Sequence, residues 1–454
     1  MRKLVEFQIL DVNAVHYGYD LFELMKNAGN NIAEYISELV SKETPIIFAC
    51  GSGNNGGDGY IAASILQDKG YTTKIFAVSN PKSQISIKAA SGYSGEIFNF
   101  SDFPNVVHTS FLIVDCLLGS GVIGSPRAPF NEIIKKINKY ENILAVDVPS
   151  GFGTNLAVKP KITITFHDKK LGMTKKNCGK IVVSDIGFSK DIDQKTGPGE
   201  LLLYPKFDSK KHKGQNGKVA IVGGGPYSGA PALAGLGAYR SGVDLVDVFV
   251  PESSYQQVSS FAPELIVHKL EGEIVTSEVI KYLDRDKYDS IVVGPGMGKN
   301  KDSILAVQKI IDKFDNVVID ADAIVNYDFR NSNIIITPHR GELSRLKINN
   351  TKKEMMKFAK DSHLTLFLKG EKDMITDGHY YKINNTGHPR MAVGGTGDLL
   401  SGLCGGLLAK GLSPFEASRL AAYSFGKAGE MCYEEYGAGF LPSDLGLCIS
   451  RTLV

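Results

Sequence analysis

Glycines that follow short apolar runs constrain the fold of this chain more than any other feature of its sequence. The 454 residues include 49 glycines, and these cluster where apolar runs end. Residues 45–50 enter one such turn and residues 218–222 enter another, and a helical pattern follows each. Strand, glycine turn and helix in this order are typical of a parallel α/β sheet. Such sheets bind ligands at the carboxyl ends of their strands, where these turns lie.

The length of the chain exceeds one ordinary core and predicts two or three domains. The 51 basic and 49 acidic residues give a net charge of +2, so we expect no nucleic acid and no membrane surface as a partner. No run approaches the ~20 apolar residues of a membrane span. The N-terminal residues carry charges where a signal peptide needs an unbroken apolar run. The six cysteines are scattered without a CxxC pair, which predicts buried free thiols and a cytoplasmic location.

The first half of the chain begins with a helical pattern and a glycine loop. Apolar residues at spacings of three and four predict one helix over residues 9–40. A strand at 45–50 then runs into Gly51-Ser-Gly-Asn-Asn-Gly-Gly-Asp-Gly59 and a second helix. A glycine loop between strand and helix is the context of phosphate binding, although the spacing is not the dinucleotide GxGxxG pattern. A tight turn capped by Asp58 is the structural alternative.

Three further predicted strands end in acidic residues. They span 111–114, 143–146 and 162–166, and the residues that follow them include Asp115, Asp147 and the pair His167–Asp168. At the carboxyl edge of a sheet such groups can converge on one pocket. Any one of them alone would more often be a cap or a turn residue.

A linker separates two predicted domains. Residues 186–215 are rich in glycine, proline and lysine and have no clear period, so we predict domains at 1–205 and 206–454. The basic cluster within 206–213 lacks interleaved aromatics and is typical of a solvated hinge rather than a nucleic-acid patch. The second domain repeats the strand pattern, with predicted strands at 218–222, 244–250, 289–293, 316–319, 333–336 and 364–368.

The stretch Met391-Ala-Val-Gly-Gly-Thr-Gly-Asp-Leu-Leu-Ser-Gly402 closes this series. Its three glycines precede leucines at helical spacing, which predicts a helix N-terminus whose free N–H groups and dipole favour an anion. A carboxylate is a poor phosphate ligand, so we interpret Asp398 as the acceptor of a proton from a hydroxyl. A capping role for Asp398 is the alternative.

The motifs of the first half resemble the N-terminal domain of NAD(P)H-hydrate epimerases. GNNGGDG, the DxLLGxG-like stretch at 115–121 and DVPSG at 147–151 occur in family order within roughly the first 200 residues. The resemblance implies a Rossmann-like three-layer domain that binds K⁺ through Asn55, Asp115 and Ser150. It places Asp147 as the residue that transfers the proton, and Lys26 stands where the family usually has an acidic residue. The implied hydrate site comprises Asn54, Asn55, Gly56, Gly57, Asp58, Gly119, Ser120, Gly121, Val122, Ile123, Gly124, Ser125 and Asp147.

The second half resembles the ribokinase-like ADP/ATP-dependent NAD(P)H-hydrate dehydratases. HKGQNGKVAIVGG, YSGAPALAG, GPGMG, DADA, TPHRGE, LKGEKD and GHPRMAVGGTGDLLSG follow one another in family order. The resemblance implies an α/β/α domain that uses Mg²⁺ with ADP or ATP. Hydrate contacts are implied for Ala230, Gly296, His339 and Asp398. Nucleotide contacts are implied for Lys369, Gly370, Glu371, Lys372, Asp373, Gly394, Gly395, Thr396 and Gly397. Asp320, Asp322 and Glu342 are either caps or water-mediated Mg²⁺ ligands.

Together the two resemblances imply a fused repair enzyme for hydrated nicotinamide cofactors. One domain would interconvert the R and S hydrates, and the other would dehydrate the S form at the expense of ADP or ATP. We expect NADHX, NADPHX and the adenine nucleotide as small-molecule partners, and a homo-oligomer. Two alternatives stay open at this point. The second domain could be a kinase that phosphorylates a small alcohol and stops at the ester, or the first domain could be a module that only binds a ligand.

Overall fold

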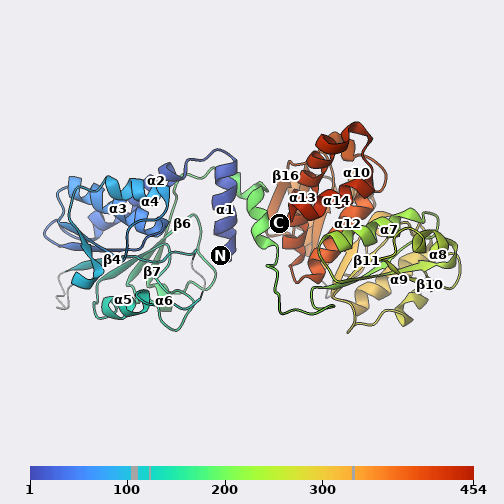
Figure 1. Ribbon diagram of the computed structural model, residues 1–454, viewed down its shortest axis with the longest axis horizontal. Helices are drawn as coiled ribbons and strands as arrows, with labels where there is room; N and C mark the ends of the chain where they lie inside the picture. The colour runs from blue at the N-terminus through green and yellow to red at the C-terminus, as the bar shows by residue number, and fades with distance from the viewer. Residues whose placement is uncertain (104–110, 122–123, 330–332, 454) are drawn as a thin grey trace. The chain divides into compact units, whose positions relative to one another are not determined.

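The computed structural model describes residues 1–103, 111–121, 124–329 and 333–453. The chain forms two compact units, Met1–Ile192 and Asp193–Val454, and each contains its own sheet and helices (Figure 1). In the described ranges, no helix is both long and apolar enough to cross a membrane. All six cysteines are free and buried, which confirms that prediction.

The first unit is built on a parallel seven-stranded sheet in the order β3-β2-β1-β4-β5-β6-β7. The strand order reverses between β1 and β4, and such a switch point opens a crevice at the carboxyl ends of the strands. The strands are β1 (Ile46–Cys50), β2 (Thr73–Ala77), β3 (Ile97–Asn99), β4 (Leu112–Cys116), β5 (Ile143–Val146), β6 (Ile162–Phe166) and β7 (Lys180–Ser184). The helices are α1 (Leu4–His16), α2 (Leu21–Leu39), α3 (Asn54–Asp68), α4 (Gln84–Ser91), α5 (Phe130–Ile137) and α6 (Lys175–Cys178).

Helices cover both faces of this sheet. Successive side chains of a strand point to opposite faces, so Phe48 packs with α2, α3 and α4, whereas Ile47 and Ala49 pack with α5. The first unit is therefore the three-layer Rossmann-like domain that the sequence predicted.

The single helix predicted over residues 9–40 is wrong, because two helices occupy this region. Helix α1 ends at His16, and Gly18 adopts a φ of 86° that turns the chain. Asp20 then caps α2, since its side chain accepts a hydrogen bond from the Phe22 amide at 2.8 Å. The apolar periodicity of the sequence continues from α1 into α2, so the sequence pattern alone did not indicate the end of the first helix.

The second unit has a nine-stranded sheet in the order β10-β9-β8-β11-β12-β13-β14-β15-β16. Strands β8 to β14 run parallel, and β15 and β16 form an antiparallel edge. The strands are β8 (Lys218–Val222), β9 (Leu245–Pro251), β10 (Ile266–Leu270), β11 (Ser290–Val293), β12 (Asn316–Ile319), β13 (Asn333–Ile336), β14 (Leu364–Leu368), β15 (Asp373–Thr376) and β16 (Tyr381–Asn384). The longer helices are α7 (Gly229–Arg240), α8 (Glu252–Ser259), α9 (Lys301–Lys313), α11 (Lys352–Asp361), α12 (Thr396–Ala409), α13 (Pro414–Tyr436) and α14 (Pro442–Thr452), and α10 (Arg340–Leu343) is a single turn.

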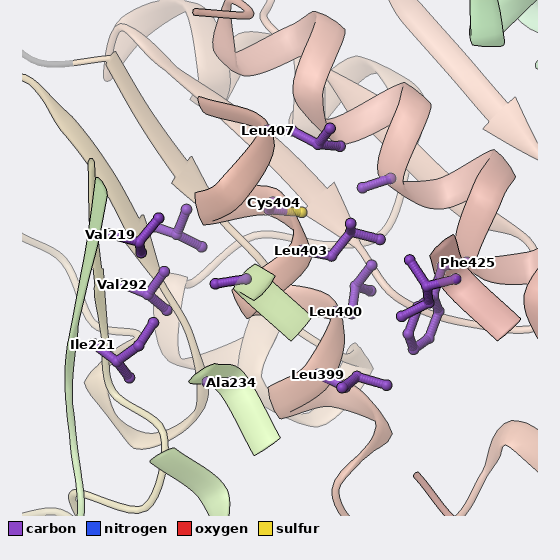
Figure 2. Close-up of a cluster of buried hydrophobic side chains, with 14 of the residues drawn as sticks. Val219, Ile221, Ala234, Val292, Leu399, Leu400, Leu403, Cys404, Leu407 and Phe425 are labelled. Atoms are coloured by element: carbon purple, nitrogen blue, oxygen red, sulfur yellow. The ribbon is translucent and has the colours of Figure 1, made fainter. Parts of the chain in front are cut away.

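Helix α12 is held in the apolar core of the second unit. Figure 2 shows Leu399, Leu403 and Leu407 of this helix among buried side chains of neighbouring strands and helices. Helix α7 approaches so closely that a Cβ on Gly402 would lie 1.8 Å from the Ala234 carbonyl oxygen. Packing this tight fixes where the N-terminus of α12, and with it Asp398, lies.

The compact units divide earlier than the domain boundary predicted at 205/206. The segment after Ile192 packs on the second unit, because the Thr196 amide donates to the Ile383 carbonyl at 3.0 Å. Glu200 is fully buried and forms an ion pair with buried Arg419, Oε2 to Nε at 3.3 Å. The exposed basic segment begins only after these contacts, and Phe207 within it is 88% exposed.

Candidate active sites

The first candidate site is a cavity of about 900 Å³ in the first unit. Its wall includes the loops that leave β1, β4 and β5, together with residues of α1 and α2, so it lies at the switch point of the sheet. Residues implied by the epimerase resemblance that line the cavity are Asn54, Asn55, Asp58, Gly119, Ser120, Gly121, Gly124, Ser125 and Asp147.

Two other implied residues of this site, Gly56 and Gly57, do not line the cavity. A Cβ on Gly56 would lie 2.0 Å from the Gly51 carbonyl oxygen, and one on Gly57 would lie 2.6 Å from the Met25 Sδ. Gly56 therefore lets α3 pack closely beneath the loop, and Gly57 lets α3 pack closely against Met25 of α2. Val122 and Ile123 lie outside the described residues. Lys26 pairs with Glu23 at 2.6 Å, and Met25 rather than Lys26 lines the cavity.

Asp147 is held at both of its carboxylate oxygens. Its Oδ1 lies 2.6 Å from the Nζ of Lys170, and its Oδ2 accepts a hydrogen bond from the Ser120 amide at 2.7 Å. Burial acts to raise the pKa of Asp147, but Lys170 and the hydrogen bonds outweigh burial, and the pKa falls below its usual value. The backbone of Asp147 has a φ of 65°, which is rare for a residue with a side chain.

Two other carboxyl groups line the same cavity and behave in the opposite way. Burial and the nearby Asp147 charge raise the pKa of Asp11 to about 6. Burial, Asp147 and Asp11 raise the pKa of Asp58 well above its usual range. Carboxyl groups with pKa values pushed apart in one cavity can divide the roles of acid and base between them.

Sequence reasoning missed Lys170 and Asp11. Lys170 lies in the loop that follows β6. Its position shortly after a predicted strand could have marked it as a candidate for the site, but the sequence analysis did not name it. Asp11 fell within the single helix predicted for residues 9–40. A carboxylate on such a helix is expected to face solvent. Only the placement of α1 against the cavity brings Asp11 to the site.

The three residues implied for K⁺ binding gather beside this cavity. The Oδ1 and Nδ2 atoms of Asn55 are buried and have no hydrogen-bond partner among the described residues. Asp115 is fully buried, and its oxygens accept from the Ser150 amide at 2.8 Å and the Ser150 hydroxyl at 2.6 Å. Burial raises the pKa of Asp115 to about 6, although the hydrogen bonds from Ser150 and Leu117 oppose this rise. A buried amide oxygen without a partner, as in Asn55, and a buried carboxylate, as in Asp115, are oxygen ligands that suit a hard cation.

The second candidate site surrounds the N-terminus of α12. Gly395 precedes the helix with a φ of 98°, and no side chain caps the first turn. Burial and the Asp320 charge raise the pKa of Asp398 to about 7, although Lys369 opposes them. The Lys369 ammonium lies 2.7 Å from the Asp320 Oδ1 and only 3.2 Å from where a Cβ on Gly397 would be. A buried ammonium therefore stands directly beside the anion-binding turn.

His339, Ala230 and Gly296 come from neighbouring loops of this unit. The Nδ1 of His339 accepts hydrogen bonds from the Gly341 amide at 2.9 Å, so His339 caps the one-turn helix α10. Its side chain remains 59% exposed, and its Nε2 lies 3.5 Å from the Glu342 Oε1. A Cβ on Gly296 would lie 3.3 Å from the Ala230 Cβ, so these two residues are in contact.

The implied nucleotide loop 369–373 connects β14 to β15. Its last carboxylate, Asp373, accepts from the Gly370 amide at 3.1 Å and from the Asn384 amide group at 3.1 Å. Asp373 thus shapes the turn, whereas Glu371 and Lys372 are exposed on it. The Thr396 hydroxyl donates to the Met391 carbonyl at 2.8 Å and closes the glycine loop. The surroundings of Gly394 are open.

Asp320 and Asp322, the two acidic residues after β12, have different ion-pair partners. Asp320 accepts from Lys369 and, at 2.8 Å, from the Thr337 hydroxyl. Asp322 pairs instead with Arg345 at 3.3 Å. No group of three metal-binding side chains occurs among the residues that the structure describes.

Comparison with known proteins gives a family for each unit and relatives for the whole chain. Residues 219–451 match the family described as NAD(P)H-hydrate dehydratase, and residues 21–172 match the family described as YjeF-related protein N-terminus. The chain is 36% identical to the bifunctional NAD(P)H-hydrate repair enzyme Nnr of Archaeoglobus fulgidus, covering 99% of this chain and 97% of that protein. It is also 36% identical to the protein of the same name from Methanothermobacter thermautotrophicus, covering 98% and 93%.

Solved structures resemble the second unit. One is the ADP/ATP-dependent NAD(P)H-hydrate dehydratase of Bacillus subtilis, co-crystallised with ATP and Mg²⁺. It matches with a TM-score of 0.51 and 26% identity, over 56% of this chain and 95% of that one. A ribokinase-like superfamily protein of Enterococcus faecalis matches with a TM-score of 0.51 and 22% identity, over 57% and 95%. The second unit therefore has the ribokinase-like α/β/α fold.

Proposed function

The chain belongs to the family of bifunctional NAD(P)H-hydrate repair enzymes, and on this premise we propose a task for each of its two sites. The cavity of the first unit epimerises the R and S forms of NADHX and NADPHX. The site at α12 dehydrates the S form back to NADH or NADPH at the expense of ADP or ATP. The observation that carries the second assignment is Asp398, a carboxyl group with a pKa of about 7 beside a buried ammonium and a helix N-terminus.

In the dehydratase site, hydroxide is a poor leaving group, so the hydroxyl of the S hydrate must first be activated. We assign Asp398 to take the hydroxyl proton while the oxygen attacks the terminal phosphorus of the nucleotide. The amides of the first turn of α12 and the Lys369 ammonium stabilise the transferring phosphoryl group. Loss of phosphate and of a ring proton then restores the dihydronicotinamide. Ala230, Gly296 and His339 are assigned to the hydrate, and the 369–373 turn to the nucleotide.

Mg²⁺ enters this scheme with the nucleotide rather than as a resident metal. Asp320 is already neutralised by Lys369, which leaves few carboxylate oxygens for a metal cage. Magnesium usually keeps waters and binds substrate phosphates through one or two protein carboxylates. Glu342, whose pKa is raised by burial, is a further acidic side chain beside Lys369.

In the epimerase site we assign Asp147 to proton transfer at the hydroxyl-bearing carbon. The lowered pKa keeps this carboxylate ionised, as a base requires. Asn55, Asp115 and Ser150 would hold K⁺ through their oxygens. When bound, the ion would supply the positive charge that the buried Asp115 lacks.

Two broader assignments accompany these sites. We propose a cytoplasmic location, in keeping with six free buried cysteines, which a reducing compartment preserves. We also propose a homo-oligomer. The oligomeric state is measured by light scattering of the purified chain.

The deciding experiment incubates the protein with pure S hydrate, pure R hydrate and a mixture, each with ADP or ATP and Mg²⁺. Recovery of dihydronicotinamide absorbance from the S form in the presence of a nucleotide is the expected result. Recovery from the R form faster than its spontaneous epimerisation is expected from the first unit. A stable phosphate ester with no recovered cofactor would instead identify a kinase, and binding of the R form without turnover would identify a binding module.

A further inference from the structure

We propose that Lys170 is a positioning residue of the epimerisation site, where its buried ammonium fixes the Asp147 carboxylate in place and in its ionised form. The proposal rests on the epimerase function proposed above. Lys170 lies in the loop after β6 and lines the same cavity as Asp147.

Every hydrogen of the Lys170 ammonium has a defined acceptor. A lysine ammonium has three N–H donors. The Nζ of Lys170 lies 2.6 Å from the Asp147 Oδ1, 2.7 Å from the Thr165 hydroxyl and 3.2 Å from the Phe166 carbonyl. It also lies 4.3 Å from the centre of the Phe7 ring, a favourable place for a cation. The ammonium is therefore fixed in position and in orientation.

Burial of this charge is costly, and the cost points to a role for it. Only 1% of the Lys170 side chain is exposed. A buried ion pair is usually no more stabilising than apolar residues of the same shape, because both charges lose their hydration. The pair instead fixes one oxygen of Asp147 while the Ser120 amide fixes the other. A carboxylate held at both oxygens cannot rotate away from the cavity.

The N-terminus of the chain holds the Lys170 loop against the cavity. The Arg2 amide donates to the Lys169 carbonyl at 3.0 Å, and the Leu171 amide donates to the Arg2 carbonyl at 2.7 Å. Helix α1, which follows Arg2, contributes Phe7 and Asp11 to the cavity wall. The N-terminal segment therefore both holds the loop that carries Lys170 and supplies part of the cavity wall.

The other charges around Asp147 explain why it needs a cation. Asp11 faces it from α1, Asp58 from α3 and His167 from the loop after β6. Both carboxyl groups interact unfavourably with the Asp147 charge. Without Lys170, Asp147 would stand among other acidic groups and would bind a proton more readily.

The test compares Lys170→Met with Lys169→Met in the full-length protein. Methionine preserves the apolar stem and removes the charge, and Lys169 is the exposed neighbour in the same loop. The rate of epimerisation of pure R hydrate is measured against pH, with the spontaneous rate subtracted. Dehydration of the S form by the same samples reports whether the protein is folded and active.

For Lys170→Met we expect the acid limb of the epimerisation profile to move to higher pH by about 1–3 pH units, since an opposite charge at this distance lowers a carboxyl pKa by about that much. Each pH unit on that limb is a tenfold loss of rate, whereas KM changes little. Lys169→Met should keep the parent profile. A parent profile for Lys170→Met would overturn the proposal. A parent protein that does not epimerise at all would instead refute the proposed function.

A second variant covers the case in which Lys170→Met does not fold. Thr165→Val removes one acceptor of the ammonium and keeps both charges and the side-chain shape. With one hydrogen bond fewer, the Lys170 ammonium is held less firmly. The acid limb of the epimerisation profile should therefore move to higher pH, by less than in Lys170→Met. An acid limb unchanged from that of the parent in folded Thr165→Val would also overturn the proposal.

Discussion

Replacement of Asp398 by asparagine should abolish dehydration while making the second unit more stable. In the folded protein the pKa of Asp398 rises from its ordinary 3.8 to about 7. The folded state therefore holds the proton more tightly than the unfolded chain does. Ionisation of Asp398 therefore destabilises the folded state: the cost begins as the pH rises above 3.8 and is complete above about 7. Asparagine carries no charge and avoids this cost.

The size of the effect follows from the same two values. The gap between 3.8 and about 7 corresponds to about 4 kcal/mol at pH 8. Asp398 is partly exposed, so solvent screening reduces this to about 2 kcal/mol. The lost attraction between the carboxylate and the helix N-terminus offsets only about 0.5 kcal/mol. For a unit of this size, a net gain of 1–2 kcal/mol raises the Tm by about 2–8 °C.

The assay pairs calorimetric unfolding with turnover. We expect a higher Tm for Asp398→Asn at pH 8, and a difference that shrinks as the pH falls toward 4. Recovery of cofactor from the S hydrate should fall by about 10²–10⁴-fold, because the acceptor of the hydroxyl proton is gone. Affinity for ADP, which is held by backbone amides and Lys369, should remain close to that of the parent or rise slightly.

The matched control is Asp444→Asn, because Asp444 occupies the same third position of helix α14. Its Oδ2 accepts a hydrogen bond from the Leu441 amide at 2.8 Å, so this residue is a true cap. We expect Asp444→Asn to lower stability by about 0.3–1 kcal/mol and to keep turnover. An Asp398→Asn protein that behaves like this control would return Asp398 to a capping role and refute the reasoning.

Three further outcomes are expected. Asp147→Asn should stop epimerisation of pure R hydrate, measured above the spontaneous rate, and leave dehydration of the S form unchanged; clearance of R at the parent rate would exclude Asp147 as the base. Asp115→Asn should remove the rise in Tm that K⁺ gives over Na⁺ at equal ionic strength, and a rise equal to that of the parent would place the ion elsewhere. A fragment that begins at Asp193 should be about 3 kcal/mol more stable to denaturant than one that begins after Glu200, because the shorter fragment leaves Arg419 buried without its carboxylate. Equal stability of the two fragments would support the predicted boundary at 205/206.

The order of the strands and the glycine turn at the second candidate site were predictable from the sequence. Strand, glycine turn and helix are local patterns, and the strands predicted at 218–222, 316–319, 333–336 and 364–368 have those bounds in the structure. The stretch from Met391 to Gly402 forms a glycine loop followed by a helix, as its spacing indicated. Asp115, within β4, and Asp147, after β5, were found because each follows an apolar run directly.

Only the tertiary structure decided which of these groups meet. The break at Gly18 places Asp11 on a separate helix beside the first cavity. The loop after β6 brings Lys170 to Asp147. Lys369, which follows β14, pairs with Asp320, which follows β12 at the same edge of the sheet. Short-range propensities are properties of a few adjacent residues and can be read from sequence. Ion pairs, burial and the pKa values they set depend on groups that only packing brings together, because burial and Coulomb interactions act through space and not along the chain.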